Sequence, residues 1–395
     1  MSIYEQPHSK QPIILLSIGF RPFFIVASIA AVVLILLWLV SLHSSSIELP
    51  NYFGTVAWHG HEMLFGYTGG VIAGFLLTAV RNWTGVATWS GTKLGLLLAV
   101  WIAGRLLPWF NDVPPLIITV VDLSFFPLLA IGLSAPLRQG KNRVNLIFIP
   151  LILAMAFANL VSHLQLRGLS IGLGDALYVM LDLVLLLIVL ISGRVLPFFT
   201  RSAIPGFQPC TRKIVERLTF VVLLAIIITD LVETIPKFVS TLLWLIFALT
   251  QAVRLSGWTD RRISRIPVLW VLYTGYIWMI IGALLQGLAE AGMFPATLAL
   301  HSIAIGVIGV FTLGMMARVT RGHTGRNIGV GKLTVVGFIL LNLAALMRVF
   351  GPVVLPDAYS LWIVFSGAAW AIAFGLFTLR YVPRLLQPRI DGRPG

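Results

Sequence analysis

Apolar runs of about 20 residues recur along the whole chain, and each has the length that a helix needs to cross a ~30 Å bilayer core. We place twelve such runs at residues 23–42, 59–80, 92–110, 114–134, 144–165, 174–198, 216–235, 236–256, 266–287, 295–318, 331–351 and 356–380. With 58% hydrophobic and only 11% charged residues, the composition excludes a soluble globular protein. The sequence therefore predicts an all-α integral membrane protein, with residues 1–395 as a single polytopic domain.

The positive charges alternate along the chain. Only four of the 28 Lys and Arg residues fall in the odd-numbered loops: Arg105, Arg167, Lys237 and Arg348. The others lie in the two termini and the even-numbered loops, which is the positive-inside pattern of a membrane protein. We therefore expect both termini in the cytoplasm, and we assign the net charge of +14 to this pattern. The expected partner is the lipid bilayer and not nucleic acid.

Ionisable residues gather at the outer ends of the predicted helices. His59, His61 and Glu62 stand at the start of the second helix, where ionisable groups are costly and usually functional. The predicted topology also places these residues toward the outer side: His43, Asp122, His163, Asp182, Asp230 and His301. Histidine is a common ligand of haem iron and copper. The pattern predicts a histidine-built metal site near the extracytoplasmic face.

The segment around His61 has a second copy 240 positions later (301 − 61). Aligning His61 with His301 superposes further pairs without a gap: Gly66 on Gly306, Gly69 on Gly309, Gly74 on Gly314, Arg81 on Arg321, Thr84 on Thr324 and Gly85 on Gly325. A weaker middle copy places Asp182 on the column of Glu62. We expect a pseudo-threefold repeat of four-helix units near residues 20–140, 141–260 and 261–380. The equivalent spans 59–80, 174–198 and 295–318 should then line one cavity.

Several of these residues have simpler alternatives. A lone histidine at the membrane interface, such as His43, is often an ordinary polar residue, and Met63 suits either Cu(I) or packing. Carboxylates commonly hold the second nitrogen of a ligating imidazole, a role open to Glu62 and Asp122, and to Asp182 by its place in the repeat. The glycines permit close helix packing or leave room for a flat macrocycle.

Residues two apart on a helix point to opposite faces. His59 and His61 therefore cannot bind one metal ion from an ideal helix. We expect one of them to precede the second helix.

The chain carries these motifs: Gly19–Phe24 (GFRPFF), Trp58–Gly66 (WHGHEMLFG), Gly74–Val80 (GFLLTAV), Asn82–Gly85 (NWTG), Asn159–His163 (NLVSH), Leu300–His301, Gly314–Val319 (GMMARV) and Gly322–Arg326 (GHTGR). Together they resemble the NnrS family over the whole chain. The resemblance implies a twelve-helix protein of the bacterial inner membrane that contains haem and copper. It also implies a link to denitrification and tolerance of nitric oxide. It further implies that four histidines are ligands of haem or copper: His59, His61, His163 and His301.

Three functions remain open on the sequence. The first is a haem and copper protein that binds or converts nitric oxide, or relieves its damage. For the haem that the resemblance implies, the single cysteine, Cys210, and the lack of a Cys-x-x-Cys-His motif predict binding without thioether links, so we expect the b type. The second is a twelve-helix transporter, although the repeat is parallel and transporter repeats are commonly inverted. The third is an assembly factor that hands metal to another enzyme.

Overall fold

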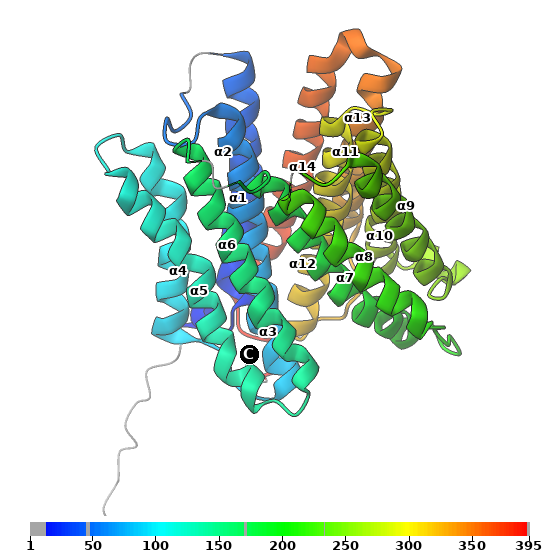
Figure 1. Cartoon of the computed structure of the whole chain (residues 1–395). Helices are drawn as coiled ribbons and strands as arrows, with labels where there is room; N and C mark the ends of the chain where they lie inside the picture. The colour runs from blue at the N-terminus through cyan, green and yellow to red at the C-terminus, as the bar shows by residue number, and fades with distance from the viewer. Residues whose placement is uncertain (1–12, 45–47, 170–171, 233, 393–395) are drawn as a thin grey trace, which may run out of the picture.

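The computed structural model describes residues 13–44, 48–169, 172–232 and 234–392, which form helices joined by short connections, with no strand among them (Figure 1). The α-helices are α1 (Phe20–His43), α2 (Thr55–His61), α3 (Gly69–Thr84), α4 (Gly91–Leu106), α5 (Pro115–Gln139), α6 (Phe148–Leu166), α7 (Ala176–Ala203), α8 (Lys213–Leu231), α9 (Lys237–Ser256), α10 (Pro267–Glu290), α11 (Ala296–His301), α12 (Val310–His323), α13 (Lys332–Val354) and α14 (Tyr359–Leu385). The predicted all-α class is confirmed.

Two of the membrane-length helices contain a π-helical segment. The segment η2 (Glu62–Thr68) joins α2 to α3, and η6 (Ser302–Gly309) joins α11 to α12. Both segments begin directly after the histidines that the alignment pairs, His61 and His301. Single π-helical turns inside α-helices are frequent at functional sites. The two spans Thr55–Thr84 and Ala296–His323 are therefore continuous helices with the same internal order.

Eleven of the described helices are long and apolar enough to cross a membrane. The remaining long helix, α8, carries charged residues near its ends: Lys213, Glu216, Arg217 and Asp230. Oε1 of Glu216 lies 2.9 Å from Nε of Arg254 in α9, so the charge of Glu216 is compensated by an ion pair. With α8 included, twelve long helices correspond to the twelve predicted runs. The predicted seventh run, 216–235, extends four residues past the observed end of α8 at Leu231.

Three helices form the centre of the bundle. In Thr55–Thr84, Ala176–Ala203 and Ala296–His323, 83, 72 and 78% of the most apolar stretch is buried, against at most 67% for any other span. They are the second helices of the three expected repeats. The hydroxyls of Tyr67 and Thr312, 2.6 Å apart, join the first to the third. Polar side chains on these helices therefore meet other protein atoms, where they can be paired.

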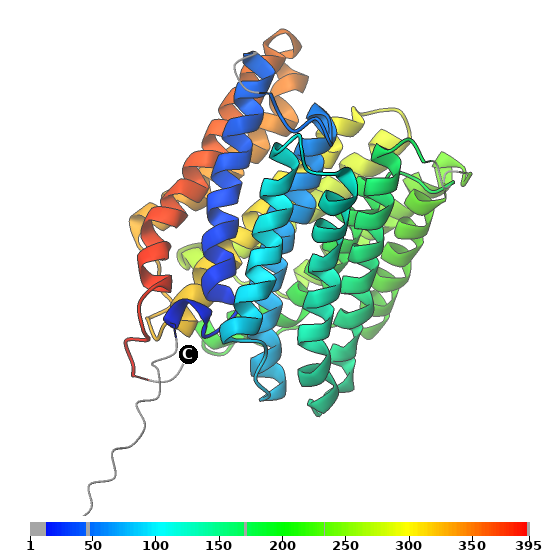
Figure 2. The same ribbon diagram turned by 90° about the vertical axis from the view of Figure 1, so that its left-hand side faces the viewer.

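The two ends of the described chain meet at one end of the bundle (Figure 1). Nη1 of Arg21 donates to the carbonyl oxygens of Leu385 and Gln387, both at 2.7 Å. Figure 2 shows α1 (blue) beside α14 (red), and Nε1 of Trp370 donates to the carbonyl oxygen of Ala31 at 2.9 Å. We call the opposite end, which holds α2 and α11, the histidine end. A chain that crosses the membrane an even number of times must have both of its ends on the same side.

Candidate metal cluster and histidine cavity

Three buried side chains from α2, α5 and α6 come together at the histidine end: His61, Asp122 and His163. One ligand atom from each lies within 4.8 Å of the other two. Oδ2 of Asp122 is 3.3 Å from Nε2 of His61 and 3.1 Å from Nε2 of His163. We call these three residues the His61 cluster. Two imidazole nitrogens and a carboxylate oxygen form a donor set that suits copper or zinc.

The second nitrogen of each imidazole in the His61 cluster also has a partner. Nδ1 of His61 lies 3.3 Å from Oε1 of Glu62, and Nδ1 of His163 lies 2.7 Å from the hydroxyl of Tyr52. Such outer contacts fix the orientation and tautomer of ligating histidines in metal sites. The cluster therefore has both the inner donor set and the outer contacts of a metal centre.

Arg105 of α4 bridges two carboxylates beside the His61 cluster. Its Nε lies 2.7 Å from Oε2 of Glu62, and its Nη2 contacts Oδ1 of Asp122. Asn159 donates from Nδ2 to Oδ2 of Asp122 at 2.8 Å. These ionised side chains are at most 9% exposed, and two carboxylates against one guanidinium leave a net charge of −1 (+1 − 2). Buried charge is costly unless it is compensated, so a cation between the imidazoles would complete the charge balance.

The close approach of α4 to α5 depends on Gly104. A Cβ atom at this position would lie 2.8 Å from Oδ1 of Asp122. The ring of His61 packs between Phe53 and Phe65, with ring centroids 4.4 and 4.9 Å away. These apolar walls keep the site dry, which strengthens the electrostatic interactions inside it.

A separate cavity of about 300 Å³ lies beside the central helices. Residues of α2 with η2, of α7 and of α11 with η6 all line it, so the prediction that the spans 59–80, 174–198 and 295–318 share a cavity is confirmed. We call it the histidine cavity because His59 and His301 both belong to its lining. Its volume lies at the low end of small-molecule sites, and most of its lining is apolar.

Each of the two histidines of the cavity has a ring nitrogen that is available to coordinate a metal. The ring of His59 stacks on Trp38 with the centroids 4.5 Å apart, and its buried Nδ1 has no hydrogen-bond partner. Nδ1 of His301 lies 2.6 Å from the carbonyl oxygen of Thr297 and donates to it. A neutral His301 ring therefore carries its proton on Nδ1 and keeps the lone pair of Nε2 free.

The structure does not bring His61 and His301 together, although the repeat alignment pairs them. His61 lies with His163, whereas His301 shares the histidine cavity with His59. The expectation that His59 or His61 precedes the helix is wrong, because α2 begins at Thr55 and includes both. Two residues apart on one helix, their side chains point in different directions and reach different sites.

The remaining predicted residues have diverse surroundings. Met63 lines the histidine cavity. His43 is exposed at the end of α1, and its Nε2 lies 2.8 Å from the hydroxyl of Ser360, as an ordinary interfacial histidine would. Asp182 is buried, but the ionisable group that it faces is Asp230 of α8 and not a histidine.

Sequence reasoning assigned no role in the site to Tyr52, Arg105 or Arg348. The two arginines had a sequence signal, because both are exceptions to the positive-inside pattern. Tyr52 had none, since its contact with His163 depends on how the segment before α2 folds.

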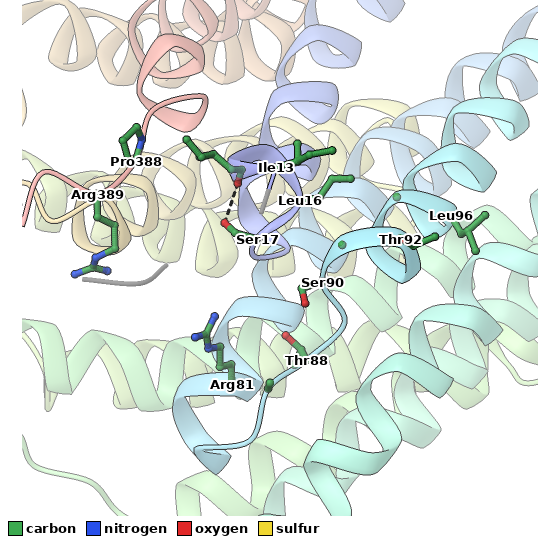
Figure 3. A pocket seen from close by; sticks show the side chains of 14 residues that line it. Ile13, Leu16, Ser17, Arg81, Thr88, Ser90, Thr92, Leu96, Pro388 and Arg389 are labelled. Atoms are coloured by element: carbon green, nitrogen blue, oxygen red, sulfur yellow. Dashed lines mark hydrogen bonds between the residues drawn. The ribbon is translucent and has the colours of Figure 1, made fainter. Parts of the chain in front are cut away.

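A larger cavity, of about 860 Å³, lies at the other end of the bundle, near the described chain ends. Figure 3 shows its wall, in which Arg81 and Arg389 stand among small polar and apolar residues such as Ile13, Thr88 and Leu96. Its described lining contains no histidine, cysteine or carboxylate. This cavity therefore offers no metal-binding donor set.

The sequence also matches a known protein family. Residues 14–389 match the family model described as NnrS protein, which is nearly the whole chain. No curated protein matches the chain.

Proposed function

The chain belongs to the NnrS family, and from this premise we propose that it is a haem- and copper-containing membrane protein. We propose that it serves nitric oxide metabolism or tolerance of nitrosative stress in a denitrifying bacterium. We place it in the inner membrane, with both termini in the cytoplasm and the histidine end outside. The alternating positive charges and the shared location of the chain ends support this orientation.

The His61 cluster is our proposed copper site. The supporting observation is its donor set, with His61 and His163 as imidazole ligands and Asp122 as the carboxylate ligand. The net charge of the surrounding buried groups favours a cation. Imidazole nitrogen suits copper, and the contacts of Glu62 and Tyr52 with the second ring nitrogens would hold both ligands in place.

The histidine cavity is our proposed haem site. His59 and His301 are the residues that would hold the haem iron through imidazole nitrogen, and the unpartnered Nδ1 of His59 is the buried atom that such a ligand would explain. Aromatic rings in the wall would pack against an apolar macrocycle: Trp38, Tyr67 and Trp370. Val56 in the lining is 75% exposed, so the cavity reaches the molecular surface at the histidine end. When bound, haem iron supplies a metal to which nitric oxide can bind.

The observation that carries the proposal is the presence of two separate histidine sites at one end of the bundle. The test is the haem and copper content of the purified full-length protein, together with its absorption spectrum before and after addition of nitric oxide. We expect a Soret band that shifts with nitric oxide, and bound copper. A colourless, copper-free protein from cells supplied with both would contradict the proposal and favour the transporter.

A further inference from the structure

Arg348 of α13 is a buried cation with an unmet hydrogen-bonding requirement. It is 7% exposed, and its Nη2 donates to the hydroxyl of Tyr359 at 3.3 Å. Its Nη1 is buried and has no partner among the described residues. An isolated buried charge is strongly unfavourable, and a buried polar atom without a partner calls for a ligand or a water molecule.

Two other arginines inside the bundle have carboxylate partners. Arg105 pairs with Glu62 and Asp122, and Arg254 pairs with Glu216. The described structure contains no ion pair of this kind for Arg348. Buried guanidinium nitrogens without a hydrogen-bond partner also occur at Arg326 and Arg384, but of these three arginines it is Arg348 that lines the histidine cavity.

Arg348 lies in the wall of the histidine cavity. His59 and His301 line the same cavity, so the three side chains share one electrostatic environment. Asp175 also lines the cavity, but its Oδ1 accepts a hydrogen bond from the backbone nitrogen of Leu177 at 2.7 Å, as the N-cap of α7. The wall therefore combines free imidazole nitrogens, aromatic rings and a guanidinium that lacks an anion.

We propose that Arg348 binds an acidic group of the ligand that occupies the histidine cavity. The chemical class is an amphiphilic molecule with an apolar body, a centre that imidazole binds, and a carboxylate at its edge. The inference rests on the proposed function, in which the ligand is haem and the carboxylate is a propionate. Guanidinium suits this role because its planar fork matches the geometry of a carboxylate and its charge does not titrate.

The test compares two ligands in haem-depleted full-length protein in detergent: iron protoporphyrin IX and its dimethyl ester, which lacks the two carboxylates. We expect the wild type to bind the free acid about 10- to 100-fold more tightly than the ester, as a charge-assisted hydrogen bond would require. Arg348→Gln should remove this preference. Arg348→Lys, which keeps the charge without the fork, should keep part of it.

Arg318→Gln is the matched control, because Arg318 is 8% exposed and its guanidinium lies over the ring of Phe199 at 3.6 Å. It should keep the wild-type preference, and partition of the porphyrins into micelles affects all variants alike. Equal binding of acid and ester by the wild type would overturn the inference and leave the haem proposal standing. Binding of neither compound would overturn both. The wild-type comparison needs no variant, so it holds even where a variant fails to fold.

Discussion

Replacing Arg105 by glutamine should destabilise the metal-free protein more than the loss of an ordinary ion pair would. In the wild type, Arg105 bridges Glu62 and Asp122, and these side chains are at most 9% exposed. The substitution changes the net charge of the three residues from −1 to −2 and leaves two carboxylates facing each other in a dry site. Removing one partner of a buried pair typically costs about 3–5 kcal/mol.

A second substitution separates this charge effect from lost packing. Arg105→Gln combined with Glu62→Gln restores the net charge to −1, with Asp122 as the remaining carboxylate. We therefore expect the double variant to be more stable than Arg105→Gln alone, by at least about 1 kcal/mol. As a control, Arg262→Gln removes the ion pair of Arg262, which is 51% exposed, with Asp260. An exposed pair of this kind contributes little to stability, because water and salt screen it.

The assay is reversible unfolding of the purified protein in mixed micelles, followed by tryptophan fluorescence as the denaturing detergent fraction rises. The free energies of unfolding of the three variants and the wild type are compared without added metal. If Arg105→Gln is no less stable than Arg262→Gln, or if adding Glu62→Gln destabilises it further, the buried charge balance is not as we describe it.

Three further predictions follow from the same structure. A reporter fused after residue 50 should report the periplasm, and one fused after residue 140 the cytoplasm; the reverse result at either site would overturn the proposed orientation. Gly104→Ala should lower copper affinity about 10- to 100-fold, because the added Cβ would lie 2.8 Å from Oδ1 of Asp122; unchanged affinity in a copper titration would contradict the tight packing. His43→Ala should leave haem and copper content unchanged, since His43 is exposed and bonded to Ser360; loss of either cofactor would show that His43 has a role in the site.

The helical fold was predictable because apolar length alone determines which segments can cross a bilayer as helices. Details of the backbone inside a helix were harder to predict from the sequence. The π-helical segment Glu62–Thr68 leaves no trace in an apolar pattern, because it alters the backbone and not the composition. The start of α2 at Thr55 was missed because His59, Gly60 and His61 interrupt the apolar pattern directly after its first turn.

The separation of His61 from His301 has an explanation in the expected repeats. The His61 cluster uses α2 and α5 of the first repeat and α6 of the second. The histidine cavity combines α1 and α2 of the first repeat with α11, α13 and α14 of the third, besides α7. Asp182 and Asp230 face each other from α7 and α8, which both belong to the second repeat. Both histidine sites thus include helices of more than one expected repeat, and the equivalent histidines His61 and His301 occupy different sites.

Two basic residues that break the positive-inside pattern pointed to the histidine sites, but our predictions did not use them. Arg105 and Arg348 each belong to the third helix of their expected repeat, and each lies buried at one of the two histidine sites. A basic residue on the disfavoured side of a membrane protein needs an internal partner or a ligand. Which of the two applies could not be read from the sequence, because it depends on the carboxylates that the fold places nearby.

The most direct test of two separate histidine sites is cofactor analysis of four alanine variants at matched protein levels. We predict that His59→Ala and His301→Ala lose haem and retain copper. We predict that His61→Ala and His163→Ala lose copper and retain haem, because the two pairs lie in different parts of the bundle. Loss of both cofactors in all four variants, or unchanged content in all four, would contradict the account.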